Sequence, residues 1–84
     1  MKHPDSVYYT EGISGQRKFT FEVFREADGS YRAIAARWNA RVNKVVEQTQ
    51  FTAPDKAALR EQPYPSTRQV KIFLNSEFWN DSDV

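Results

Sequence analysis

The sequence contains no cysteine and only one histidine, His3. Without thiols the chain can form no disulfide, offer no thiolate to a metal and present no cysteine nucleophile, and a cytoplasmic setting is the natural expectation. No apolar run approaches the roughly 20 residues of a membrane-spanning helix. The first residues also lack the apolar segment of a signal peptide. We therefore expect no membrane partner.

Groups that could carry out catalysis are equally scarce. His3 lies in an N-terminal segment where nothing is expected to position it or tune its pKa, as a catalytic base requires. There is no glycine-rich phosphate loop, no nucleophile motif and no spacing of metal ligands. Exposed strand positions explain Glu22 and Glu26, and a turn explains Asp28. The sequence therefore predicts no enzyme, no cofactor, no metal site and no small-molecule substrate.

The chain is short and its charge is nearly balanced. Its 84 residues allow one hydrophobic core, because a domain of this size buries only about 60–65% of its unfolded surface. We expect one domain over residues 1–84, with a lead-in over residues 1–15 and a frayed tail over residues 80–84. The formal charge of +1 lacks the strongly basic character of a dedicated nucleic-acid binder.

What the sequence does contain is aromatic side chains in an alternating pattern. Between Arg17 and Ala27, apolar side chains alternate with polar ones, which predicts a strand. Asp28-Gly29 then favours a two-residue hairpin turn, and residues 31–38 form the returning strand. This register places one set of apolar pairs on a single face: Phe19 with Trp38, Phe21 with Ala36, and Val23 with Ile34.

The rest of the chain predicts three further elements. Val45 to Phe51 is read as a third strand, and a helix follows with Thr52 as its N-cap and its end before Pro63. Alternation in Arg68 to Leu74 predicts a fourth strand. Its side chains are assigned to two faces, with Val70, Ile72 and Leu74 inward and Lys71 and Phe73 outward. Phe78 and Trp79 are expected to fold back over the core.

The predicted fold is α+β. It has a small antiparallel sheet of four strands and one short helix, in the order (β)-β-β-β-α-β. The sheet has five strands if Val7, Tyr8 and Tyr9 add an edge strand at the N-terminus.

Two segments resemble HicB-like antitoxin domains. The strand–turn–strand unit from Phe19 to Ala36, with its acidic Asp-Gly-Ser-Tyr turn, is similar to the opening hairpin of that family. The segment from Gln48 to Glu61 looks like the strand and helix that follow, and the similarity covers roughly residues 18–74. The resemblance implies a compact protein that binds and blocks a partner without catalysis. This chain has Arg37 to Lys44 where the family usually has a segment containing proline and glycine.

Two functions from different classes follow from the surface residues. The first is a protein-interaction module, such as an inhibitor, antitoxin-like regulator or accessory subunit, whose partner is another protein or a second copy in a homodimer. Its expected interface residues are Phe24, Phe73, Phe78 and Trp79. The alternative is a nucleic-acid-binding domain that uses the basic loop Arg37–Lys44, with phosphates neutralised by cations and bases stacked on an aromatic ring. Its expected contacts are Arg17, Lys18, Arg37, Trp38, Arg41 and Lys44.

Overall fold

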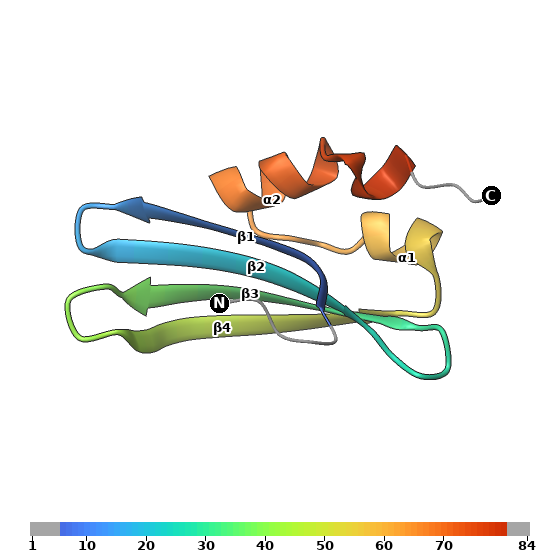
Figure 1. The fold of residues 1–84 in the computed structure, drawn as a ribbon, viewed down its shortest axis with the longest axis horizontal. Helices are drawn as coiled ribbons and strands as arrows, with labels where there is room; N and C mark the ends of the chain where they lie inside the picture. The colour runs from blue at the N-terminus through green and yellow to red at the C-terminus, as the bar shows by residue number, and fades with distance from the viewer. Residues whose placement is uncertain (1–5, 81–84) are drawn as a thin grey trace.

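The structure, a computed structural model, describes residues 6–80, so His3 and the tail residues 81–84 lie outside the described range. One antiparallel sheet comes first in the chain, and its strands lie in chain order (Figure 1). The strands are β1 (Ser6–Ser14), β2 (Arg17–Arg25), β3 (Tyr31–Asn39) and β4 (Lys44–Ala53). Three short helical segments follow: α1 (Lys56–Arg60), α2 (Arg68–Leu74) and the 3₁₀ helix η1 (Glu77–Asn80).

The α+β class is confirmed, but the predicted order of elements is only partly right. The N-terminal strand exists as β1, so the sheet has four strands. Arg68–Leu74 forms α2, and its assignment to a strand was wrong. Thr67 caps this helix, since its hydroxyl accepts a hydrogen bond from Val70 N at 3.2 Å. Helical spacing buries Val70 and Phe73 on one side and leaves Ile72 43% exposed, which reverses the predicted inward and outward assignments of Phe73 and Ile72.

The predicted hairpin between β2 and β3 forms, but its register is shifted by one residue. Phe21 lies opposite Ala35, and Val23 lies opposite Ala33. The turn is longer than two residues, because Glu26 N donates to Ser30 O at 2.8 Å. Asp28 closes this turn by accepting from Ser30 N at 2.9 Å, and the backbone of Gly29 adopts a φ of +91°. A longer turn changes the pairing, and a shift by one residue moves side chains to the opposite face of the sheet.

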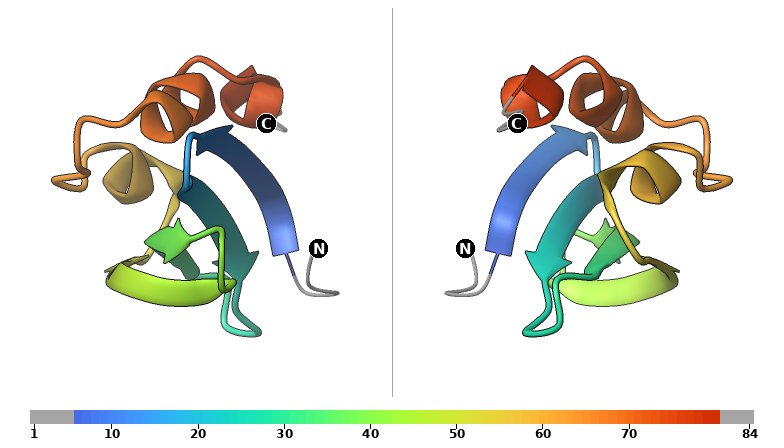
Figure 2. Two further views of the ribbon diagram at one scale, coloured as in Figure 1. Left: turned by 90° about the vertical axis from the view of Figure 1, so that its left-hand side faces the viewer. Right: turned by 90° about the vertical axis from the view of Figure 1, so that its right-hand side faces the viewer.

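The helices pack on one face of the twisted sheet, which we call the core face; we call the other face the open face (Figure 2). Asp55, rather than the predicted Thr52, caps α1 by accepting from Ala58 N at 2.9 Å. Thr52 belongs to β4. The core consists of side chains from strands and helices together: Phe21, Val23, Ala33, Ala53, Leu59, Val70 and Phe73.

Phe78 and Trp79 do fold back over the core, as predicted. Their rings lie 5.3 and 5.0 Å from the ring of Phe73. Trp79 Nε1 donates to the carbonyl oxygen of Phe73 at 3.0 Å, and Lys56 Nζ donates to that of Phe78 at 3.0 Å. These bonds attach η1 to both α helices. The helical layer thus covers the half of the sheet farther from the β1–β2 and β3–β4 turns (Figure 1).

Candidate functional site

The β1–β2 turn and the β3–β4 turn lie side by side at one end of the molecule (Figure 1). Ala40 N donates a hydrogen bond to Gln16 O at 2.8 Å and so joins the two turns directly. In the adjoining strands, Arg17 lies opposite Asn39 and Lys18 lies opposite Trp38. We call this part of the molecule the hairpin tips.

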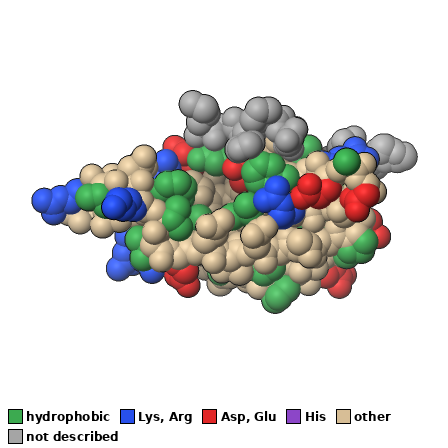
Figure 3. Space-filling view, turned by 90° about the horizontal axis from the view of Figure 1, so that it is seen from below, with side chains coloured by type: hydrophobic (Ala, Val, Ile, Leu, Met, Phe, Trp, Pro, Cys, Tyr) green, Lys and Arg blue, Asp and Glu red, His purple; other side chains and the backbone are tan. Residues whose placement is uncertain are grey.

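The hairpin tips bring together the predicted basic residues, which we call the basic end: Arg17, Lys18, Arg37, Arg41 and Lys44. Lys and Arg side chains gather at this end when the molecule is seen from the side away from the helices (Figure 3). Arg17, Arg41 and Lys44 are exposed and form no ion pair with any residue in the range 6–80. The basic end is therefore a solvated positive surface.

The other two basic side chains are held by single carboxylates. Lys18 Nζ lies 3.7 Å from Glu11 Oε1, and an Arg37 amino group lies 3.4 Å from Glu47 Oε1. Both carboxylates are well exposed. Ion pairs of this kind contribute only about 0–1 kcal/mol, so either pair can open at little cost.

Trp38 lies beside the basic end on the open face, not on the core face as predicted. The one-residue shift in register places it beside Thr20, and its Nε1 donates to Thr20 Oγ1 at 3.0 Å. Lys18 Nζ lies 5.3 Å from the centroid of the indole ring. The interpretation of Trp38 as a core partner of Phe19 was therefore wrong. Instead, the indole is fixed on a solvent-facing surface next to cations.

A shallow groove of about 420 Å³ runs from Trp38 along the open face. Besides Trp38, its walls include Thr20, Ile34, Ala36, Val45 and Gln48. Thr20, Val45 and Gln48 were not predicted as members of this surface, because the predicted register put Trp38 on the opposite face. A β-bulge between Arg37 and Trp38 brings Val45 opposite Trp38.

A polar cluster borders the open face on β1. The hydroxyl of Tyr9 donates to Glu11, and this bond, together with nearby Lys18, lowers the pKa of the Glu11 carboxyl. Burial and the same bond to Glu11 raise the pKa of Tyr9. A lowered pKa keeps the Glu11 carboxyl ionised at neutral pH, so it accepts the hydrogen bond from the Tyr9 hydroxyl.

The aromatic residues predicted as a protein interface are mostly inaccessible. Phe73 is fully buried at the centre of the core, so its prediction as an interface residue was wrong. Phe24 is 7% exposed, because the guanidinium of Arg32 lies 4.6 Å from its ring centroid. Phe78 and Trp79 are partly buried against the core. None of the four therefore provides a large exposed apolar surface.

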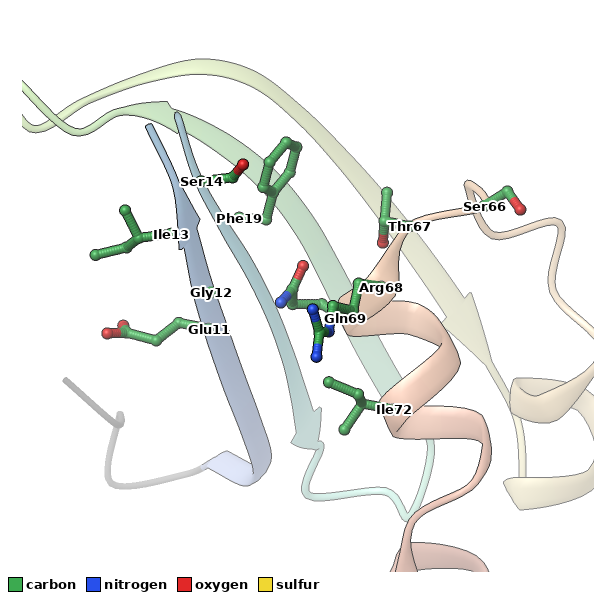
Figure 4. A pocket seen from close by; sticks show the side chains of 10 residues that line it. All are labelled: Glu11, Gly12, Ile13, Ser14, Phe19, Ser66, Thr67, Arg68, Gln69 and Ile72. Carbon is green, nitrogen blue, oxygen red and sulfur yellow. The ribbon is translucent and has the colours of Figure 1, made fainter. Parts of the chain in front are cut away.

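A second hollow, a cleft of about 690 Å³, lies between β1 and α2 (Figure 4). Gln69 points into it, and Phe19 and Ile72 line it, whereas Glu11 and Ile13 point away to the other side of β1 (Figure 4). Gln69 is 5% exposed, and its amide occupies the space that a Cβ on Gly12 would need. The lining also includes Arg68, beside Gln69, and the hydroxyls of Ser14, Ser66 and Thr67 (Figure 4). This cleft therefore has one cation, whereas the basic end has five.

Taken together, these features define a small β-meander domain with helices on one face, Trp38 on the other face and a basic end at the hairpin tips. Within residues 6–80, no three His, Asp or Glu side chains gather closely enough to hold a metal ion. In the same range no helix has the length and apolar character needed to cross a membrane. No protein-family model, curated protein or solved structure matches the chain. The resemblance to HicB-like antitoxin domains stays a prediction.

Proposed function

We propose that this domain binds single-stranded nucleic acid without catalysing a reaction. One observation carries the proposal: the two joined hairpin tips gather five basic residues at one end of the sheet, where Lys18 shares the open face with Trp38 and the strand residues Arg17, Arg37 and Lys44 lie around the tip on the other face. Cations that follow a phosphate backbone and aromatic rings that stack on bases are the two parts of a single-strand binding surface. The proposal includes a cytoplasmic location for the protein, which is the expectation from the sequence.

In the proposed complex, Arg17, Arg41 and Lys44 contact phosphates. They are exposed and have no carboxylate partner in the described chain, so binding a phosphate breaks no existing ion pair. Each phosphate contact releases condensed counterions, which makes the affinity fall as salt rises.

Trp38 is the proposed stacking platform. Its hydrogen bond to Thr20 limits rotation of the indole, so less side-chain entropy is lost when a base binds. Stacking of a base on an aromatic side chain contributes about 1–3 kcal/mol. Lys18, already next to the ring, lies within reach of the phosphate beside a stacked base. The groove along the open face continues this surface past Ile34 and Gln48.

The protein-interaction module remains the competing proposal, but its expected interface has lost support. It depended on exposed Phe24 and Phe73, which are buried. A single-stranded ligand is favoured over a duplex because only unstacked bases can reach the indole of Trp38. Neither α1 nor α2 offers a helix to a major groove, since both are short and pack on the core face.

Fluorescence anisotropy with labelled single-stranded DNA and RNA oligonucleotides, and with a duplex of the same sequence, tests the proposal. We expect binding to the single strands at low salt, and about a tenfold or greater loss of affinity for Trp38→Ala. The double variant Arg41→Ala/Lys44→Ala should lower the log–log salt slope by about 1.4, or 0.7 for each lost phosphate contact.

A matched control removes the same charge elsewhere. Arg25 and Lys71 are exposed and lie away from the hairpin tips, so Arg25→Ala/Lys71→Ala changes the net charge equally. This control should leave both the affinity and the salt slope almost unchanged. Absence of binding at low salt, or equal losses for the two double variants, would overturn the proposal.

A further inference from the structure

The cleft between β1 and α2 contains a buried amide that the fold leaves without a partner. Gln69 is 5% exposed, and its side chain points into the cleft (Figure 4). Within residues 6–80 its amide forms no hydrogen bond, and neither amide atom is sealed from solvent. Buried side-chain amides are normally hydrogen-bonded, because an unsatisfied one is costly. A ligand in the cleft would supply the missing partners.

The walls of the cleft suit a flat ring that carries a negative charge. Phe19 is half-buried and Ile72 is 43% exposed, so both present apolar surface. Arg68 is exposed and forms no ion pair with any residue in the range 6–80. The acidic side chain of Glu11 points to the other side of β1 (Figure 4). The volume of about 690 Å³ lies within the roughly 300–1,000 Å³ of small-molecule sites.

The cleft adjoins the part of the basic end that lies on the core face. Ser14 in its lining lies opposite Arg17 on β2. A neighbouring hollow of about 150 Å³ shares Phe19 and Thr67 with the cleft and is also lined by Arg37. Arg37 lies directly opposite Phe19, and Arg17 is two residues before it, so all three side chains share one face. A strand that follows these cations around the tips therefore reaches the cleft.

We propose that the cleft receives one unstacked base of the bound strand. The base packs against Phe19, and the Gln69 amide forms hydrogen bonds with its edge. A side-chain amide has two donors and one acceptor, so it matches a base edge on which a donor and an acceptor are neighbours. Arg68 contacts a phosphate beside that base. This inference rests on the proposed function and adds a second base site to it, on the face opposite Trp38.

Removing the amide while keeping the shape of the side chain tests this site. Gln69→Met is close in length and volume, and it should weaken binding of a single-stranded oligonucleotide about fivefold or more. The salt slope should stay unchanged, because no phosphate contact is lost. Gln62→Met is the matched control, since the Gln62 amide donates to the Ala58 carbonyl oxygen at 3.1 Å and lies outside the cleft lining. This control should bind like the unmodified protein.

Scanning with abasic nucleotides distinguishes a base contact from an indirect effect on the fold. The scan uses the shortest strand that binds with full affinity and replaces one base at a time. At the position that occupies the cleft, the abasic change and Gln69→Met should each weaken binding, and the two losses should not add. Additive losses at every position, or equal affinities for Gln69→Met and Gln62→Met, would overturn the inference. Binding that still depends on Trp38 and on salt would then leave the proposed function intact.

A free nucleoside monophosphate offers the same chemistry as a nucleotide within a strand, and NMR separates the two sources. Adding the oligonucleotide should shift the side-chain amide signals of Gln69 at concentrations where a nucleoside monophosphate does not. A tighter response to the free nucleotide would overturn the inference. If no strand binds at all, the proposed function fails and this inference fails with it.

Discussion

The covered end of the sheet and the hairpin tips are made from the same four strands but have opposite surroundings. At the covered end, Phe21 of β2 packs against Tyr64, from the segment between α1 and α2, and against Phe73 of α2, with ring centroids 4.7–6.2 Å apart. At the hairpin tips the side chains of residues 41–44 are exposed, and three of the five basic residues have no ion pair within the described chain. Stability therefore comes from one end of the sheet, and the other end is free to carry a binding surface.

The largest effect should come from removing a phenylalanine ring at the covered end. Phe73 is fully buried, and its ring lies within 4.7–6.2 Å of five other aromatic rings. Phe73→Ala should lower the free energy of unfolding by about 3–5 kcal/mol, a large part of the stability of a small domain. Chemical denaturation followed by tryptophan fluorescence measures this change.

The same substitution nearer the tips provides the comparison. Phe19 is only partly buried and lies opposite Gly12 and Arg37. Phe19→Ala should cost about 1 kcal/mol, less than a fully buried side chain contributes. If Phe73→Ala and Phe19→Ala lowered the free energy of unfolding equally, packing at the covered end would contribute no more to stability than packing at the tips.

A loss similar to that of Phe19→Ala is expected at the boundary between the two regions. A Cβ on Gly12 would lie 2.2 Å from Gln69 Nε2, so Gly12→Ala forces the buried Gln69 side chain to move. We expect a loss of about 1 kcal/mol, in the range typical of overpacking. In a double-mutant cycle, Gln69→Ala should remove much of that loss, because it removes the clashing amide. Strictly additive losses would contradict this contact.

The smallest effect concerns the open face. The Tyr9 hydroxyl is the main cause of the lowered pKa of Glu11, so Tyr9→Phe should raise that pKa toward its ordinary value. Since a lowered folded-state pKa stabilises the protein above the unfolded-state value, this contribution is lost as pH falls through the folded-state pKa. NMR titration of the Glu11 side chain in both proteins measures the shift. An unchanged pKa in Tyr9→Phe would show that the hydrogen bond has no such influence.

Local patterns in the sequence predicted much of the sheet but failed where two patterns competed. Alternation of Phe19, Phe21 and Val23 correctly marked β2. In α2, the same kind of alternation at Val70, Ile72 and Leu74 hid a helical spacing between Val70 and Phe73. A capping residue three positions before Val70, Thr67, was the signal that could have identified the helix.

The candidate site was predictable in its residues but not in its geometry. The basic residues around Arg37 and Lys44 were visible as a charge cluster. Their proximity to Arg17 depends on the bond between Ala40 and Gln16, which joins two turns distant in the sequence. The side on which Trp38 lies depends on the length of the turn around Asp28, because one extra residue reverses the faces.

The order of elements along the chain also has a consequence during synthesis. Within residues 6–80 the four strands precede α1, α2 and η1, so these helices cannot cover the core face of the sheet until residues 56–80 leave the ribosome. At roughly 5–20 residues per second, those residues take about 1–5 s to be made. Phe21 and Val23 stay exposed for that interval, and a nascent chain in this state is the form that chaperones would meet.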